Sequence, residues 1–205
     1  MRTVFMSTMA ISTFFASMVS ASVLAAGTAP PPAEVIHFLG PDDTLLAYRA
    51  GELFGTGLSG AVMIVRHPVP DEAYDFDKNP CELIVLKGEG RTLSKFDTGT
   101  TVVDCVYNDL NKRLGSMALN DLVSIGSGSF SFINQKERGT DRFYFRYSVT
   151  KAQWYLERAT ATFTGAEGIT SEEALYPRDF GWTSLSDVSP ENVARALNKH
   201  KTVSK

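Results

Sequence analysis

The chain has 205 residues, of which 43% are hydrophobic and 21% are charged, values that are ordinary for a folded globular protein. Its 20 basic and 23 acidic residues give a formal net charge of −3 at pH 7. This mild acidic excess offers no electrostatic basis for binding nucleic acid or an anionic membrane, so neither is expected as a partner.

Residues 1–26 predict a secretory signal peptide. A single cation, Arg2, precedes a mostly apolar stretch, and small residues at Val23, Ala25 and Ala26 mark a cleavage site. Serine and threonine residues dilute the apolar run, which makes a membrane anchor the weaker alternative. We therefore expect a single-domain mature chain of roughly 180 residues in the periplasm or outside the cell, without membrane insertion.

The next segments predict a proline-rich lead-in followed by short strands. Residues 27–34 contain three consecutive prolines and are expected to be extended. Four apolar runs then alternate with turn signals and are candidate strands: Val35–Leu39, Thr44–Tyr48, 61–67 and 81–88.

Cys81 and Cys105 are the chain's two cysteines. An even pair in an exported protein is most simply a disulfide bond, whereas a catalytic thiol needs a neighbouring base and a reducing compartment. Residues 100–107 are a further candidate strand, which places the cysteines on neighbouring strands or strand ends. Residues 108–122 are expected to form a loop or one short helix.

Three later stretches alternate with period two and predict two antiparallel hairpins over residues 126–135, 141–149 and 152–163. Their large apolar side chains are expected to share one core: Phe130, Phe132, Phe143, Phe145, Tyr147, Trp154 and Leu156. The opposite face is expected to carry polar and aromatic side chains: Arg142, Tyr144, Arg146, Tyr155 and Glu157. The prediction is a mainly β, antiparallel domain over residues 35–165.

Residues 166–205 are expected to form a turn-rich tail that ends in a short helix. Ser189 is the expected N-cap and Pro190 the first helical residue. Val193, Ala194 and Leu197 form a narrow apolar stripe that suits a small helix docked on a sheet edge.

Gly55, Gly57 and Gly60 have the spacing of a dinucleotide-binding motif, but that motif must open a helix. The following residues are rich in β-branched side chains and end at Pro68, so we expect a turn before a strand that begins near Ala61. At least one of these glycines should have a positive φ. No cofactor is expected.

Motifs for metal binding and catalysis are missing from the sequence. Glu52 is the only carboxylate near the glycines, which is too few for a calcium loop. His37, His67 and His200 have no metal-binding interval, and no nucleophile motif is present. We therefore expect a non-catalytic protein without a metal, while a hydrolase whose carboxylates come from distant positions remains an alternative.

Exposed loops commonly carry function, and the polar loop after residue 135 is the expected contact region for a protein partner. The candidate contact residues, which include two from the outer face of the following strand, are Glu137, Arg138, Asp141, Tyr144 and Arg146.

Four segments between roughly residues 45 and 160 resemble, in their order, exported bacterial proteins with one FG-GAP or VCBS-like unit: GELFGTGLSGAVMIVRH, CELIVLKGEGRTLSKFD, LVSIGSGSFSFIN and DRFYFRYSVTKAQWYLERA. Matching positions are Gly51, Leu53, Gly57 and 61–65 in the loop and strand, and Trp154 and Leu156 in the closing strand. Phe54, Thr56 and Gly60 stand where that family has acids. The resemblance implies a mainly antiparallel β fold without a dependable enzymatic activity, whereas these departures put the family's calcium binding in doubt for this chain.

The first functional hypothesis is a periplasmic inhibitor or immunity protein that binds an envelope-targeting toxin or a cell-wall hydrolase. Export, one disulfide and polar hairpin loops favour it. The alternatives are a secreted or envelope structural module with a vestigial calcium loop, and the carboxylate-dependent hydrolase.

Overall fold

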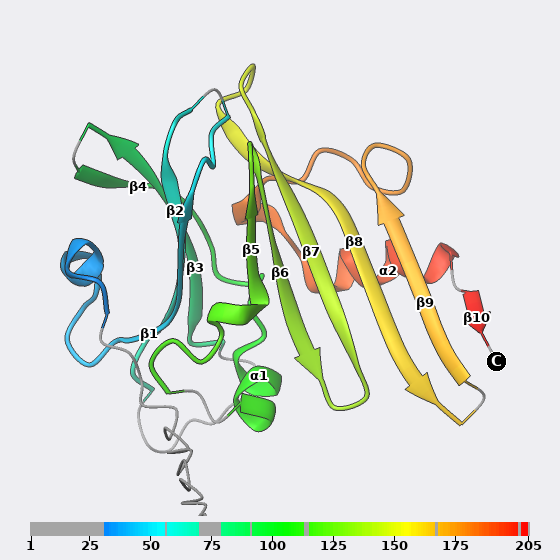
Figure 1. The fold of residues 1–205 in the computed structure, drawn as a ribbon. Helices are drawn as coiled ribbons and strands as arrows, with labels where there is room; N and C mark the ends of the chain where they lie inside the picture. Colours follow the sequence, from blue (N-terminus) through cyan, green and yellow to red (C-terminus); the bar gives the residue numbers. More distant parts are fainter. Residues whose placement is uncertain are drawn as a thin grey trace, which may run out of the picture.

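The computed structural model describes residues 31–55, 57–69, 79–90, 92–112, 115–166, 168–200 and 202–204, and the predicted signal peptide lies outside them. Within these residues the protein is mainly β, with two antiparallel meanders, which confirms the predicted fold class (Figure 1). The smaller sheet has the order β1-β2-β3-β4: β1 Thr44–Gly51, β2 Gly60–Arg66, β3 Cys81–Glu89 and β4 Thr92–Gly99. The larger sheet has the order β10-β9-β8-β7-β6-β5: β5 Val123–Gly126, β6 Ser129–Lys136, β7 Gly139–Ser148, β8 Gln153–Gly165, β9 Gly168–Leu175 and β10 Thr202–Ser204.

Short helices connect and cover the sheets. The α-helices are α1 Cys105–Lys112 and α2 Pro190–Leu197. The 3₁₀ helices are η1 Ala33–Phe38, η2 Asn120–Leu122, η3 Leu185–Asp187 and η4 Asn198–His200. In Figure 1, α1 lies near the lower ends of β5 and β6, and α2 lies behind β8 and β9.

The main core lies between the inner faces of the two sheets. Every aromatic residue that the alternation assigns to the core packs there, because alternate side chains of a strand point to the same face. The ring of Trp154 is fully buried and lies 5.6 Å from Phe54, whose ring also meets Phe96 and Tyr147 edge to face. Phe54 comes from the glycine loop, so this loop contributes to the contact between the sheets.

A second core covers the other face of the smaller sheet. It contains Val35 of η1 together with side chains of the strands: Leu45, Ala61, Met63, Val65, Ile84 and Leu86. The smaller sheet is therefore buried on both faces, which explains why β2 and the middle of β3 read as continuous apolar runs.

Three strand pairs shift register, and each shift moves side chains between faces. In β1, Leu45 pairs with Val65 and Ala47 with Ile64, so Leu46 is the extra residue. Phe96 of β4 and Glu157 of β8 are the extra residues of the other two shifts. Such bulges change the period-two pattern, so residues beyond them face the opposite way.

Two predicted strands are wrong. Residues 33–38 form η1, in which Val35 is the one fully buried side chain and Ile36 is 55% exposed. Ala33 and Glu34 of the predicted lead-in belong to this helix. Residues 100–107 do not form a strand either, because Asp104 caps α1: its Oδ1 accepts a hydrogen bond from the backbone N–H of Tyr107 at 3.1 Å.

Beyond residue 165, where the sequence predicts a turn-rich tail, the chain instead continues the larger sheet. β9 pairs with β8 from Gly165 opposite Gly168 to Arg158 opposite Leu175. The predicted C-terminal helix is confirmed as α2, where the Ser189 side chain accepts a hydrogen bond from the backbone N–H of Asn192. Its buried stripe contains Ala196 rather than Ala194.

Candidate functional site

A pocket of about 500 Å³ lies where the free ends of β6–β9 extend beyond the core. This volume is within the range of roughly 300 to 1,000 Å³ that is usual for binding sites. We call it the hairpin-end pocket, and its lining is Tyr107, Lys136, Glu137, Arg138, Asp141, Ala161, Thr162, Phe163, Thr170 and Glu172.

Lys136 supplies the pocket's central positive charge. Its Nζ lies 3.2 Å from Oδ2 of Asp141 and 3.5 Å from Oδ2 of Asp104, and 5.0 Å from the centroid of the Tyr107 ring. Burial lowers the pKa of Lys136, but the two carboxylates outweigh it and leave the pKa above its ordinary value. The ammonium group therefore stays charged and is held in one position by groups from α1 and β7.

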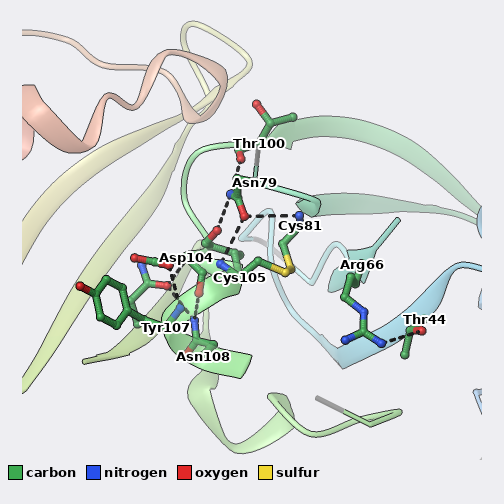
Figure 2. The surroundings of a disulfide bond; sticks show 11 residues. Thr44, Arg66, Asn79, Cys81, Thr100, Asp104, Cys105, Tyr107 and Asn108 are labelled. Carbon is green, nitrogen blue, oxygen red and sulfur yellow. Dashed lines mark hydrogen bonds between the residues drawn. A yellow bond between two sulfur atoms is a disulfide. The ribbon is translucent and has the colours of Figure 1, made fainter. Parts of the chain in front are cut away.

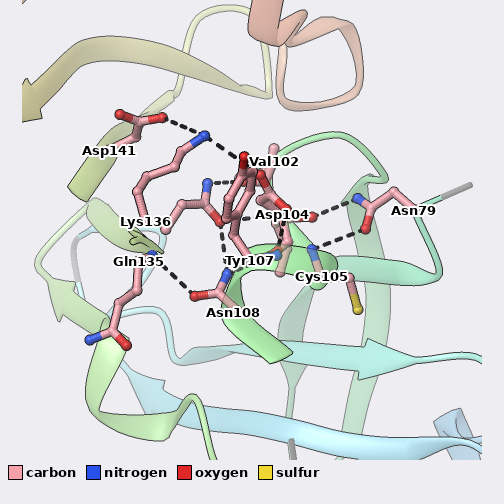
Figure 3. Close-up of polar contacts among 11 residues, drawn as sticks. Asn79, Val102, Asp104, Cys105, Tyr107, Asn108, Gln135, Lys136 and Asp141 are labelled. Carbon is pink, nitrogen blue, oxygen red and sulfur yellow. Dashed lines mark hydrogen bonds and ion pairs between the residues drawn. The ribbon is translucent and has the colours of Figure 1, made fainter. Parts of the chain in front are cut away.

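A buried amide network fixes the start of α1 against β6 (Figure 3). The side chain of Asn134 accepts hydrogen bonds from the backbone N–H of Asp104 at 2.7 Å and from Nδ2 of Asn108 at 3.0 Å. Asn108 also accepts a hydrogen bond from the backbone N–H of Gln135 at 3.1 Å. Because buried amides are costly to leave unpaired, this network holds Asp104 and Tyr107 at the pocket.

The disulfide between Cys81 and Cys105 is confirmed, but it joins the first residue of β3 to the first residue of α1 (Figure 2). The Cα atoms of the two cysteines are 5.5 Å apart. Beside it, Asn79 accepts a hydrogen bond from the backbone N–H of Cys105 at 3.2 Å and donates one to the carbonyl of Thr100 at 2.8 Å. The bond therefore anchors α1, which carries Tyr107, to the smaller sheet.

The β6–β7 turn forms the rim of the pocket. Lys136 pairs with Gly139 in the sheet, so Glu137 and Arg138 are the two turn residues. The carbonyl of Arg138 accepts a hydrogen bond from the backbone N–H of Thr164 at 2.7 Å, which ties the turn to β8. Gly139 permits this close approach, since a Cβ atom there would lie 1.9 Å from the carbonyl oxygen of Thr162.

Two partly exposed aromatic side chains line the pocket. The Phe163 side chain of β8 is 50% exposed and that of Tyr107 is 38% exposed. Ala159 is buried, and Ala161 packs against the main core, so the same face of β8 runs from the core into the pocket at Phe163. The pocket thus combines exposed aromatic surface with fixed charges.

The five residues predicted to contact a partner separate into two groups. Glu137, Arg138 and Asp141 line the hairpin-end pocket, whereas Tyr144 and Arg146 line a different hollow on the outer face of the larger sheet. Sequence reasoning missed several pocket residues: Tyr107, Phe163, Thr170 and Glu172. The sequence predicts a strand at Tyr107 and a turn-rich tail at Thr170 and Glu172. For Phe163, the alternation of apolar residues along residues 152–163 is the signal that could have found it.

The glycine loop has the backbone conformation that the sequence predicts. Gly55 and Gly57 have φ values of 70° and 79°, and β2 begins at Gly60. Oε1 of Glu52 accepts hydrogen bonds from the backbone N–H of Gly57 at 2.8 Å and from the hydroxyl of Ser127 at 3.1 Å. This carboxylate therefore closes the loop.

Within the described ranges, no cluster of three or more histidine, cysteine, aspartate or glutamate side chains could hold a metal ion. No helix in the same ranges is long and apolar enough to cross a membrane. Comparisons with protein-family models, with curated proteins and with solved structures found no match to this chain.

Proposed function

We propose that this chain is an exported, non-catalytic module that binds a protein partner through the hairpin-end pocket. The observation that carries the proposal is the half-exposed Phe163 ring beside the fixed charge of Lys136. Aromatic and arginine side chains dominate the binding energy of many protein interfaces, and Tyr107, Phe163 and Arg138 line one hollow here. A partner side chain that enters the pocket would bury both rings.

The rim of the pocket supports recognition of an enzyme cleft. Glu137 and Arg138 lie at a two-residue hairpin turn, whose strands are joined to the rest of the larger sheet. A rigid hairpin that presents polar side chains at its end can enter a cleft with little loss of conformational entropy. We therefore propose that the partner is an envelope-targeting toxin or a cell-wall hydrolase, which the chain inhibits.

The disulfide is compatible with an extracytoplasmic location, since such bonds persist in oxidising compartments. The periplasm is the proposed compartment because it contains cell-wall hydrolases and is reached through a cleaved signal peptide. Fractionation of the producing cell, with the disulfide state measured by thiol labelling, tests this location.

An inhibition assay tests the function. Purified chain is added to the cell-wall hydrolase activities of an envelope extract from the producing organism, separated in a gel that contains peptidoglycan. We expect one activity to be lost, and expect Phe163→Ala with Arg138→Ala to restore it. Inhibition of no activity, combined with normal survival of a deletion strain exposed to envelope-targeting toxins, would contradict the proposal.

A further inference from the structure

The outer face of the larger sheet contains a second hollow, of about 320 Å³, which we call the outer-face hollow. Its polar lining consists of serine, tyrosine, arginine and glutamate side chains: Ser124, Ser129, Ser131, Tyr144, Arg146, Glu157 and Arg158. It is separate from the hairpin-end pocket, because the two share no lining residue.

A bulge in β8 places two charged residues at this hollow. Phe145 pairs with Leu156 and Tyr144 with Arg158, which leaves Glu157 as the extra residue. Leu156 and Ala159 on either side are both fully buried, so Glu157 and Arg158 lie between two core positions. Bulges commonly redirect side chains next to functional sites.

Stacking holds the Arg158 guanidinium in place. Its Cζ lies 3.7 Å from the centroid of the Tyr144 ring, and Nη1 lies 3.5 Å from Oε1 of Glu173. Arg142 donates a hydrogen bond to the Tyr144 hydroxyl at 3.3 Å. A guanidinium that is already stacked loses less conformational entropy when it binds an anion.

Arg146 lies on the neighbouring position of the same face. Its Nη2 donates a hydrogen bond to Oε2 of Glu157 at 3.2 Å, and its Nε bonds the other carboxylate oxygen. The Arg146 side chain remains 50% exposed despite this pair. Both arginines at the hollow are therefore oriented by protein groups and still accessible to solvent.

Serine hydroxyls from two strands complete the hollow. The sheet register aligns Ser124, Ser131, Tyr144 and Arg158 in one row across β5 to β8, and Ser129 beside Arg146 in the next row. Ser131 is only 7% exposed, so its hydroxyl lies at the base of this row. Hydroxyl and guanidinium donors thus face one space.

The charges around the hollow favour an anion. Arg146 and Arg158 line the hollow, and Arg142 lies beside it at the Tyr144 hydroxyl. These three arginines outnumber the two neighbouring carboxylates, Glu157 and Glu173, which leaves a local positive excess on a chain of net charge −3. We propose that the outer-face hollow binds the phosphate group of a phosphomonoester. A tetrahedral phosphate presents several acceptor oxygens, which match serine hydroxyls on the floor and guanidinium groups on the wall.

A titration with inorganic phosphate and with glucose 6-phosphate tests this site. The full chain is labelled with ¹⁵N and titrated at constant ionic strength, with chloride as the reference anion. We expect saturable shifts of the backbone signals of Ser129, Ser131 and Arg158, and about tenfold weaker binding in Arg158→Gln, since one charge-assisted hydrogen-bond group is lost. Arg195→Gln on α2 is the matched control and should bind like the unchanged chain.

Phosphate monoesters occur on soluble molecules and on lipid headgroups, and a second experiment separates these sources. Vesicles of phosphatidylcholine with and without phosphatidic acid are sedimented with the full chain. Sedimentation with phosphatidic acid that is lost in Arg158→Gln supports a lipid source, whereas glucose 6-phosphate binding without sedimentation supports a soluble one. Absence of saturable shifts with both phosphates, or equal binding by Arg158→Gln that retains its fold by circular dichroism, would overturn the proposal.

Discussion

Lys136 and Asp104 form an ion pair, with 3.5 Å between Nζ and Oδ2, that joins the end of β6 to the N-cap of α1. The same aspartate accepts a hydrogen bond from the backbone N–H of Tyr107 and is itself bonded to Asn134 through its backbone N–H. One residue therefore starts the helix, binds the core network and orients the pocket lysine. The shape of the hairpin-end pocket thus depends on the stability of this junction.

Replacement of Asn134 by alanine should destabilise the protein strongly. The Asn134 side chain is 3% exposed and bonds three groups, so its loss leaves buried donors and an acceptor without partners. We expect a decrease of about 2 to 3 kcal/mol in the free energy of unfolding, measured by urea denaturation. The exposed Asn198→Ala should change it by less than about 0.5 kcal/mol, and similar losses in both variants would contradict the role of the network.

Removal of the disulfide should destabilise the protein without preventing assembly of the sheets. Cys81 and Cys105 are 24 positions apart, and a loop of this size contributes about 3 kcal/mol in the chain-entropy model. We expect Cys81→Ser with Cys105→Ser to lower the free energy of unfolding by that amount. Dithiothreitol should reproduce the loss in the unchanged chain and have no effect on the double variant.

Gly57 and Gly181 offer a matched test of the glycine loop. A Cβ atom would contact nothing within 4 Å at either position, but only Gly57 has a positive φ, of 79°. Gly57→Ala should therefore cost about 1 to 2 kcal/mol through backbone strain alone. Gly181→Ala should be nearly neutral in the same thermal unfolding experiment, and equal effects would show that φ is not the cause.

Asp97 should make stability depend on pH. Burial raises its pKa, hydrogen bonds from the backbone N–H groups of Thr98 and Trp154 oppose this, and Asp187 raises it further, with a net increase. Because the folded pKa lies above the unfolded one, Asp97 contributes stability below its unfolded value of about 3.9 and loses it as pH rises through the folded value.

The test compares Asp97→Asn with the unchanged chain by urea denaturation between about pH 3 and pH 7, a range that includes the ordinary pKa of an aspartate carboxyl group. Asparagine carries no charge at any of these values, so its stability relative to aspartate should increase as the pH rises. A difference that stays constant with pH would show that the folded pKa of Asp97 is not shifted, and one that decreases would show that it is lowered.

The strands of the larger sheet could be predicted where alternation is uninterrupted. Phe130, Phe132, Phe143 and Phe145 face the core as expected, because no bulge interrupts the pairing of β6 with β7. The outer-face positions of Tyr144 and Arg146 follow from the same period. Periodicity is reliable here because one face of each strand is buried.

Bulges and long-range contacts account for what the sequence could not predict. Simple alternation from Trp154 and Leu156 predicts that Arg158 faces the core. The bulge at Glu157 turns it to the other face, where it lines the outer-face hollow. The bulge at Phe96 likewise interrupts the period-two pattern of β4, since Lys95 pairs with Leu86 of the second core whereas Asp97 pairs with Val85 of the main core. Both irregularities depend on the partner strand, which no local pattern identifies.

Site-specific photo-crosslinking tests whether a protein partner binds at the hairpin-end pocket, as we propose. A photoreactive phenylalanine analogue replaces Phe163 in one variant and Val149, which is 76% exposed and does not line the pocket, in a control variant. Both variants are expressed in the producing cell, irradiated and separated by mass. We predict a discrete crosslinked protein for position 163, absent for position 149 and reduced by Arg138→Ala. No adduct at position 163, or the same adducts at both positions, would show that no partner binds at this pocket.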